Sequence, residues 1–546
     1  MELRRVSAAL GVALLLAAAF VGADPTPPPV KPATLFAGLG RHHHTIKTRS
    51  PEAQKFFDQG LTLVYAFNHD EAIRSFQRAA ELDPEAVMPL WGIAYALGPN
   101  INLDVDPGHE KAAFAASAKA SKLAKGASEN ERAYAEALAR RYSDDASADL
   151  EQLAADFAEA MHALAERYPD DLDAATLYAE SLMDLDPWKL WSADGKPAEH
   201  TEEIVAVLES VLRRDPTHIG ANHYYIHAME ASPHPERALP SAERLAKLVP
   251  NAGHLVHMPA HIYMRTGNYE ASARANAEAA RVDEAYIKAN DVRGVYPIMY
   301  YNHNLDFLSA AASMAGRYGD AKRASEQAAA NAAHVVKDMP MAEFLVPRPL
   351  LVDVRFQRWQ EVLQAPEPAE GMPTTRAVWH YARGVALAAK GDTSSAEKER
   401  AGFEEGAAKV PDDAIWGLNQ TKAVLAIARA SLDARIAAAK RDRKAAIAAW
   451  EVAVDAQDRL AYDEPPPWYC PVRESLGAAL FVDGQKEEAE KIFREDLERN
   501  PRNPRSLFGL WECLKAQKKT ADAEWLRRAF QDAWKNSEVD IRMEDL

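Results

Sequence analysis

The chain has 546 residues, of which 48% are hydrophobic and 8% aromatic. This is ample for a large core and too long for one compact globule. Acidic residues outnumber basic ones by 81 to 64, giving a formal net charge of −17, and such a charge repels a phosphate backbone, which makes nucleic acid an unfavourable partner.

The first 23 residues are expected to be a signal peptide. Arg4 and Arg5 form a positive start, the stretch from Val6 to Val21 is apolar, and Val21-Gly22-Ala23 is a small-residue cleavage site. The apolar stretch is short for a membrane span. We therefore expect an exported protein, periplasmic or extracellular, with no membrane span after signal cleavage.

Residues 24–50 are predicted to form a proline-rich spacer and lead-in before the folded part. The segment DPTPPPVKPA is stiff and extended by composition. The run of His42, His43 and His44 could capture a metal ion, but a polar lead-in is the simpler interpretation.

Two segments share the same spacing of small, aromatic and proline residues. In residues 53–86 the positions are Phe56, Gly60, Leu63, Ala72, Phe76, Ala79 and Pro84; in residues 470–503 they are Leu476, Gly477, Leu480, Ala489, Phe493 and Pro501. Pro216 and Pro250 are also 34 residues apart. This pattern resembles the tetratricopeptide repeat (TPR) family, and the resemblance covers nearly the whole mature chain. It implies an all-α fold, a right-handed α-solenoid of about ten to twelve TPR-like helix pairs.

The repeat spacing is interrupted in a few places, and these interruptions suggest where the domain boundaries lie. We expect an N-terminal array with a histidine-rich groove over 51–362, a linker over 363–375, and a C-terminal array over 376–546. Residues 184–200 form a long excursion carrying Trp188 and Trp191, a lid over the groove or a loop anchor. Cys470 and Cys513 are too far apart in the repeat register for a disulfide.

The histidines provide the main functional signal. His223 and His257 are 34 residues apart, as are His227 and His261, so neighbouring repeats carry the same His-x-x-x-His pair. If repeat units begin at 172, 219, 253 and 302, these positions fall on one stripe of the first helix of each unit. In TPR proteins that stripe lines the concave groove, and the resemblance implies a ligand-facing location. Its members are Glu180, His223, His227, Glu230, His254, His257, His261, His303 and Asp306.

A pair of histidines at i and i+4 can chelate a divalent metal. We predict a metal site formed by His223, His227, His257 and His261, with Glu230, His254 and His303 as further ligands. Imidazole with carboxylate favours a transition metal such as Zn, Cu or Fe. Pro259 lies within the second pair and should kink its helix.

Three functions remain open at this point. The first is an exported scaffold whose groove binds a protein, peptide or small-molecule ligand together with a transition metal. The second is a metal-dependent enzyme, a hydrolase or oxidoreductase, with Glu180 or Glu230 as general base. The third is a metal-free adaptor that docks peptides or proteins.

The chain also resembles a group of uncharacterised exported bacterial TPR proteins. The shared stretches include YAFNHDEAIRSFQRAAELDP, HYYIHAMEASPHPERALP and GHLVHMPAHIYMRTG. The resemblance supports the fold and export and implies no catalytic residues.

Overall fold

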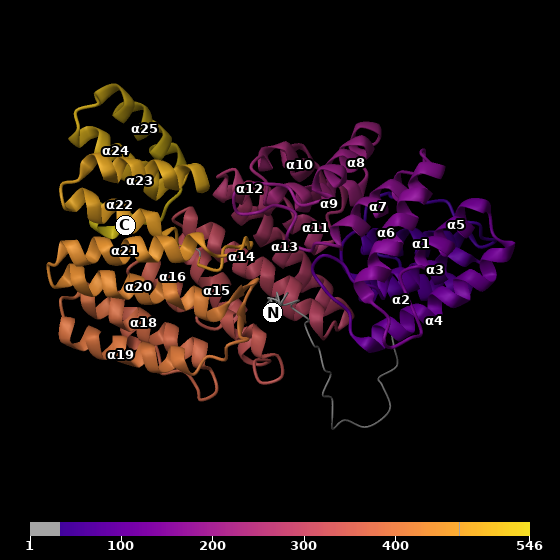
Figure 1. The fold of residues 1–546 in the computed structure, drawn as a ribbon, viewed down its shortest axis with the longest axis horizontal. Coiled ribbons are helices and arrows are strands. Elements are labelled where there is room, and N and C mark those ends of the chain that lie inside the picture. The colour runs from indigo at the N-terminus through magenta and orange to yellow at the C-terminus, as the bar shows by residue number, and fades with distance from the viewer. Residues whose placement is uncertain (1–32, 469) are drawn as a thin grey trace, which may run out of the picture. The chain divides into compact units, whose positions relative to one another are not determined.

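The computed structural model describes residues 33–468 and 470–546 (Figure 1). The predicted signal peptide and residues 24–32 lie outside the described residues. The described chain divides into two compact units. The first extends to Ser232 and includes Leu248–Asn251; the second comprises Pro233–Lys247 and Ala252–Leu546.

The helices of the first unit follow one another along the chain, with a long loop over residues 184–200 between α7 and α8. They are α1 (Pro51–Val64), α2 (His69–Leu82), α3 (Val87–Ala96), α4 (Pro107–Leu123), the short η1 (Ala124–Gly126), α5 (Glu129–Leu138), α6 (Leu150–Arg167), α7 (Leu172–Met183), α8 (Thr201–Arg214) and α9 (Ile219–Glu230). The first helix is capped by Ser50, whose side chain accepts a hydrogen bond from the Ala53 amide.

The second unit continues the same helical pattern. It begins with η2 (Pro235–Ala238), α10 (Leu239–Leu248), whose last residue belongs to the first unit, α11 (Gly253–His257), α12 (Pro259–Arg265), α13 (Tyr269–Asn290), η3 (Pro297–Tyr301), α14 (Asn302–Met314), α15 (Tyr318–Ala333), η4 (Pro340–Leu345), α16 (Arg348–Arg355) and α17 (Trp359–Gln364). It ends with α18 (Pro373–Ala389), α19 (Thr393–Ala408), the two-residue strands β1 (Ile415–Trp416) and β2 (Asn419–Gln420), α20 (Thr421–Ala439), α21 (Arg443–Asp458), α22 (Val472–Val482), α23 (Lys486–Arg499), α24 (Pro504–Ala516), α25 (Thr520–Ala533) and η5 (Met543–Asp545). The strands pair antiparallel.

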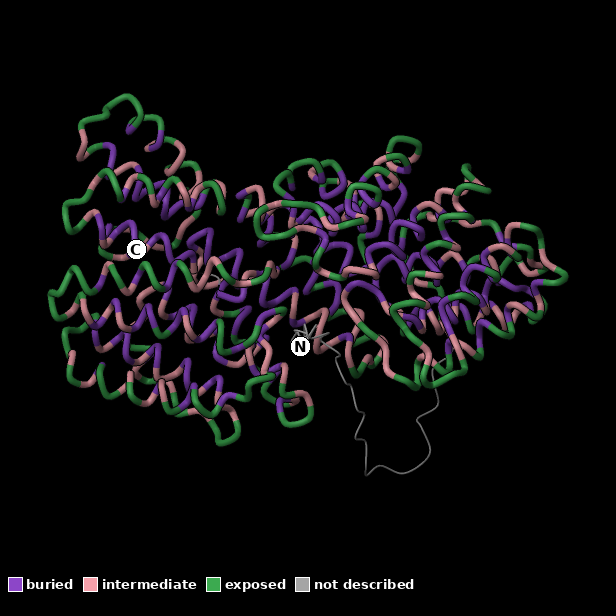
Figure 2. The backbone as a smooth tube through the Cα atoms, viewed as in Figure 1, coloured by how far each residue is buried: buried purple, intermediate pink, exposed green. Residues whose placement is uncertain are grey.

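If α11 and α12 are counted as one kinked helix, the α-helices of the described residues form twelve consecutive pairs. The pairs are amphipathic: along α8 the buried positions are 201, 204, 205, 208 and 211, the spacing of one helix face. Figure 2 shows this alternation of buried and exposed positions along the chain. The predicted all-α repeat fold is confirmed.

The repeat spacing has a packing explanation at its two ends. A Cβ atom on Gly60 or on Gly92 would lie 2.5–2.8 Å from the ring of Phe76, so the ring fits only between two glycine-bearing helices. Phe493 repeats the arrangement against Gly477 and Gly509. The 34-residue pattern thus records one aromatic ring inserted between two successive first helices.

The division between the units differs from the predicted one. Residues 363–375 lie inside the second unit, where the Trp379 indole donates to the Ala365 carbonyl at 3.1 Å. The Thr375 amide donates to Glu343 at 2.8 Å. These contacts tie the proline-rich stretch to neighbouring helices, so it is a connection between α17 and α18 within one unit, and the boundary follows Ser232 instead.

The described part of the predicted spacer and lead-in, residues 33–50, is packed against the first unit. The Phe36 amide donates to Gln59 at 2.7 Å, the Lys47 amide to Glu131 at 2.6 Å, and the Arg49 amide to Asp83 at 2.7 Å. Side chains of α1, of α5 and of the residue that follows α2 therefore accept backbone hydrogen bonds from it, and the lead-in is part of the folded unit.

Two further predictions concern the cysteines and the membrane. Cys470 and Cys513 are both free thiols, as the register predicts. Among the described residues, no helix combines the length and the hydropathy that crossing a membrane requires.

Candidate metal centre

The predicted repeat register places the histidines correctly on their helices. The expected unit starts at 172, 219, 253 and 302 are the first residues of α7, α9, α11 and α14. His223 and His227 belong to the first unit, whereas His254, His257, His261 and His303 belong to the second. The meeting of the two pairs at one point stays a prediction, and each set is described within its own unit.

In the first unit, His223 and His227 are buried on α9 with ring centroids 4.8 Å apart. His223 Nδ1 lies 2.7 Å from the Tyr65 carbonyl oxygen, and His227 Nδ1 lies 2.7 Å from Glu230 Oε1. A carbonyl and a carboxylate only accept hydrogen bonds, so Nδ1 carries the proton in both neutral rings. Nε2 is then the nitrogen with the lone pair, as metal ligation requires.

The α1–α2 turn and the long loop after α7 enclose this pair. Phe67, whose φ of 54° is in the left-handed region, packs its ring 4.6 Å from that of His223. Trp188, with a φ of 62°, places its ring 5.7 Å from that of His227. Trp191 anchors the same loop, since its indole donates to the Ala228 carbonyl at 2.7 Å. Backbone conformations of this kind cost energy and are enriched at functional sites.

In the second unit, three imidazoles converge. His257 Nε2 lies 2.7 Å from His261 Nε2 and 3.1 Å from His303 Nε2. Metal–nitrogen bonds of about 2.0–2.1 Å would place tetrahedral ligands roughly 3.3 Å apart and octahedral ligands about 2.9 Å apart. The observed separations are therefore close to those of ligands on one ion. His257 and His261 are buried and His303 is half-buried.

A buried asparagine fixes the tautomer of the central ring. Asn276 donates through Nδ2 to the Ser272 carbonyl at 3.0 Å, which directs its Oδ1 to His257 Nδ1 at 2.6 Å. His257 Nδ1 therefore carries a proton and Nε2 a lone pair. One lone pair cannot accept a full hydrogen bond from two neighbouring imidazoles, whereas a cation among the three Nε2 atoms would satisfy all of them.

Pro259 separates the helix segments that carry these histidines, as predicted. α11 ends at His257 and α12 begins at Pro259, and His261 donates its amide to the Met258 carbonyl at 3.2 Å. The ring of Phe307 on α14 lies 5.3 Å from His257 and 5.1 Å from His261. The centre therefore has an apolar wall, which weakens competition from water.

The other predicted site residues are placed as follows. His254 is buried beside the His257 cluster, with its ring 5.8 Å from that of His257 and 5.2 Å from that of Tyr300. Glu230, predicted as a ligand, holds the Nδ1 side of His227. Asp306 pairs with Arg348 at 2.9 Å.

Glu180, a candidate general base, belongs to another buried network. It accepts a hydrogen bond from the Tyr95 hydroxyl, and burial together with neighbouring Asp184 raises its pKa. A carboxyl group whose pKa is raised toward neutral pH suits a general acid or base, so the electrostatics of Glu180 do not argue against the catalytic role that the sequence suggests.

The stripe was predicted to line an open groove, but its histidines are mostly buried. His223 and His257 are 0% exposed and His227 is 5% exposed. Aromatic residues cover them: Phe67 and Trp188 in the first unit, and Phe307 in the second. Of these residues the sequence indicates only Trp188, as a lid over the groove or a loop anchor; Phe67, Phe307, Tyr65 and Asn276 are not apparent from the sequence pattern.

A second cluster in the first unit surrounds Asp173. His42 Nε2 lies 2.9 Å from Asp173 Oδ1, His44 Nδ1 lies 2.8 Å from Oδ2, and His218 Nε2 lies 3.2 Å from Oδ1. The Tyr65 hydroxyl donates to Oδ1 at 2.5 Å. The lead-in histidines thus reach a buried carboxylate, which the sequence did not indicate.

The protonation of His218 distinguishes this cluster from a metal site. His218 Nδ1 accepts a hydrogen bond from the Ala221 amide at 3.1 Å, as the N-cap of α9. In the neutral ring the proton is then on Nε2, which faces Asp173 and is blocked as a ligand. Asp173 is therefore a carboxylate surrounded by donors, and their charges lower its pKa despite burial.

The lead-in should detach at alkaline pH. Burial alone would lower the pKa of His42 and His44, but the interactions with Asp173 outweigh it and raise both values above 6.5; Asp58 contributes to both, and Asp171 to that of His44. A histidine whose pKa is higher in the folded than in the unfolded protein stabilises the fold. The stabilisation is complete below the unfolded pKa and is lost as pH rises through the folded pKa. We expect hydrogen exchange of residues 33–50, corrected for the intrinsic rate, to quicken as pH rises above about 6.5. Unchanged protection would contradict this, with α20 as the internal control.

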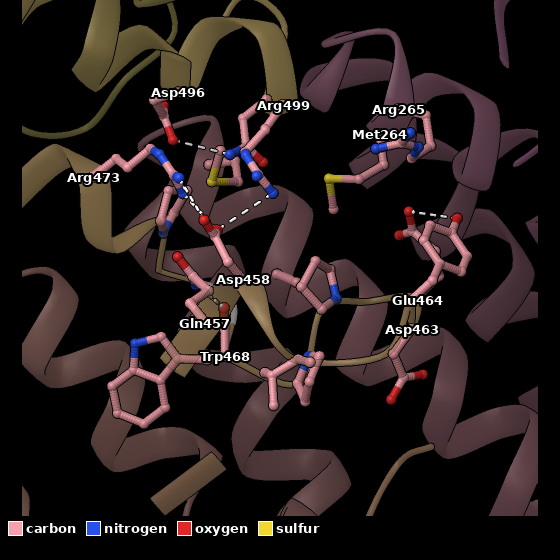
Figure 3. A pocket seen from close by; sticks show the side chains of 18 of the residues that line it. Met264, Arg265, Gln457, Asp458, Asp463, Glu464, Trp468, Arg473, Asp496 and Arg499 are labelled. Carbon is pink, nitrogen blue, oxygen red and sulfur yellow. Dashed lines mark hydrogen bonds and ion pairs between the residues drawn. The ribbon is translucent and has the colours of Figure 1, made fainter. Parts of the chain in front are cut away.

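The second unit also contains a cavity of about 220 Å³, shown in Figure 3. Its charged side chains largely pair with one another. Asp458 accepts two hydrogen bonds from Arg473 at 2.6 and 2.7 Å and lies 3.3 Å from Arg499. Tyr462 donates to Glu464 at 2.9 Å. These pairs explain how so many charges are accommodated in one cavity.

Comparison with known proteins finds only distant structural likenesses. No family model and no curated protein matches the sequence. The human IFIT1 dimer with m7Gppp-AAAA matches 89% of this chain and 91% of its own at 13% identity and a TM-score of 0.33. Yeast Tom70 matches 87% and 96% at 13% identity and 0.30. The P58(IPK) TPR domain matches 86% and 99% at 11% identity and 0.19. The twelve helix pairs of the described residues form an all-α repeat fold, and likeness at this level carries no information about ligands.

Proposed function

We propose that this chain is an exported TPR-type scaffold that binds a divalent transition metal through imidazole nitrogens. The observation that carries the proposal is the convergence of the Nε2 atoms of His257, His261 and His303 in the second unit. The His223–His227 pair supplies a second donor set in the first unit. Export is supported by the N-terminal residue pattern alone.

The supporting contacts favour metal binding over a purely structural role for the histidines. Three Nδ1 atoms, those of His223, His227 and His257, face oxygen acceptors. A metal-ligating histidine usually donates its second ring nitrogen to such an acceptor. In all three rings Nδ1 therefore faces an acceptor and Nε2 carries the lone pair, which is the arrangement that metal binding through Nε2 needs.

The donor atoms restrict the metal. Neutral imidazole nitrogens suit Zn, Cu or Fe and are unsuited to calcium or magnesium, which prefer oxygen. The proposal is for binding, because the contacts that carry it are those of histidine ring nitrogens, and Glu230, a candidate base, is engaged with His227.

Elemental analysis of protein purified without an affinity tag tests the proposal. We expect at least one equivalent of Zn, Cu or Fe per chain after dialysis. Protonated imidazole cannot ligate a metal, so affinity measured by calorimetry should fall as pH drops through about 6.5. A protein that binds none of these metals between pH 7 and 8 would refute the proposed function.

A further inference from the structure

A chain of contacts within the first unit connects the Asp173 cluster to the ligand His223. Tyr65, at the C-terminal end of α1, takes part in both. Its hydroxyl donates to Asp173 Oδ1 at 2.5 Å, and its carbonyl oxygen lies 2.7 Å from His223 Nδ1. One residue therefore joins the buried carboxylate on α7 to the imidazole on α9.

Tyr65 is held against α9 by close packing. A Cβ atom on Gly220 would lie 2.4–2.9 Å from three atoms of the Tyr65 ring, so only glycine allows the ring this position. Tyr65 is itself 0% exposed. With its hydroxyl fixed on α7 and its ring fixed on α9, the backbone carbonyl that orients His223 has little freedom to move.

Resting on the proposed function, we propose that Asp173 and Tyr65 are positioning residues for the metal ligand His223, supported by the lead-in residues His42 and His44. Asp173 lies at the N-terminal end of α7 and accepts from Tyr65 while pairing with histidines from the lead-in and from α9. It thereby joins three parts of the first unit at one carboxylate. Loss of this carboxylate would release Tyr65 and, with it, the acceptor that orients His223.

The proposal makes the lead-in a part of the metal site. His42 and His44 are 10% and 11% exposed at their side chains and act through Asp173 rather than as ligands. The histidine run after the predicted spacer is then explained by its contacts to a carboxylate 129 and 131 residues further along the chain.

The first test measures Cu²⁺ affinity and the Cu²⁺ electron paramagnetic resonance spectrum of the full chain. Tyr65→Phe and Asp173→Asn are expected to weaken binding at the first-unit site about 10- to 100-fold, the usual effect of losing a partner that supports a ligand. Tyr225→Phe is the matched control. Tyr225 lies on α9, as His223 does, but its hydroxyl donates to Glu209 at 2.6 Å. Its spectrum should match that of the wild type.

A double-mutant cycle separates positioning from general damage. If Tyr65 acts through His223, Tyr65→Phe should have no further effect on Cu²⁺ affinity in a His223→Ala background. An equal loss in both backgrounds, or no loss in either while the wild type binds Cu²⁺, overturns the proposal.

A second readout requires no metal. Nitrogen-15 spectra of histidine-labelled protein should show His223 with its proton on Nδ1, identified by the signal missing from His223→Ala. Tyr65→Phe and Asp173→Asn should lose that preference and Tyr225→Phe should keep it. If the wild type binds no metal, the proposed function fails, yet this experiment still decides the positioning role: an unchanged His223 tautomer in both variants refutes it.

Discussion

The double variant His257→Ala/His261→Ala is expected to lose the metal bound to the second unit. The two rings supply two of the three Nε2 atoms that converge there, at 2.7 Å from each other. Removal of two ligands should cost more than the roughly 10- to 100-fold that loss of one supporting partner costs. Elemental analysis and calorimetry measure the lost equivalent and the lost affinity.

Two further variants make this result interpretable. Both rings are buried, so alanine leaves space in the core; circular dichroism and thermal melting must therefore show that the fold persists. His303→Ala alters a half-buried ligand and should weaken binding with less structural cost. The control His380→Ala removes a histidine that contacts Glu399 at 2.7 Å in the same unit. Equal metal content in His257→Ala/His261→Ala, His303→Ala and the control would exclude a metal site formed by His257, His261 and His303.

The fold could be predicted because the packing between successive helix pairs depends on single residues at fixed positions of the repeat. Phe76 and Phe493 each need two glycine-bearing neighbours, so the aromatic and glycine spacing is visible without a structure. The same regularity placed the starts of α7, α9, α11 and α14 at the expected residues. Periodic local contacts leave a strong sequence signal.

The parts that could not be predicted depend on contacts between distant residues. Asp173 meets His42 and His44 across about 130 residues, and no periodicity records such a pair. Residues 363–375 have the composition of a linker, yet Trp379 and Glu343 anchor them. Composition reports the intrinsic preference of a segment, and tertiary hydrogen bonds override it.

The candidate site was predicted at the level of residue type and register. The sequence placed His257, His261 and His303 on one stripe, and the structure brings their Nε2 atoms together. It could not distinguish ligand from support, because that depends on which nitrogen faces an acceptor. Glu230 and Asn276 show this: each contacts an Nδ1 atom, which leaves the lone pair on Nε2, the nitrogen that the proposed metal would bind.

The largest loss of stability is expected from Glu474→Gln in the second unit. Glu474 is 2% exposed and pairs with Arg355 at 2.9 Å and with Arg505 at 2.7 Å. Glutamine keeps the shape of the side chain but leaves two buried guanidinium groups without a counter-charge. Breaking a buried ion pair in this way costs about 3–5 kcal/mol of unfolding free energy, measurable by urea denaturation.

Acid should weaken the same contact. Burial opposes ionisation of Glu474, but Arg355 and Arg505 outweigh it and lower the pKa of its carboxyl below 4.5. A group of this kind stabilises the fold above its unfolded pKa and loses that effect as pH falls through the folded value. The wild type should therefore lose stability below about pH 4.5, and Glu474→Gln should lack this part of the acid dependence.

The matched control for the loss of stability is Glu490→Gln. Glu490 pairs with Lys519 and Arg494 nearer the surface, and its loss should cost about 1 kcal/mol or less of unfolding free energy. Similar losses for Glu474→Gln and Glu490→Gln would show that the buried pair is not the stronger support of the second unit.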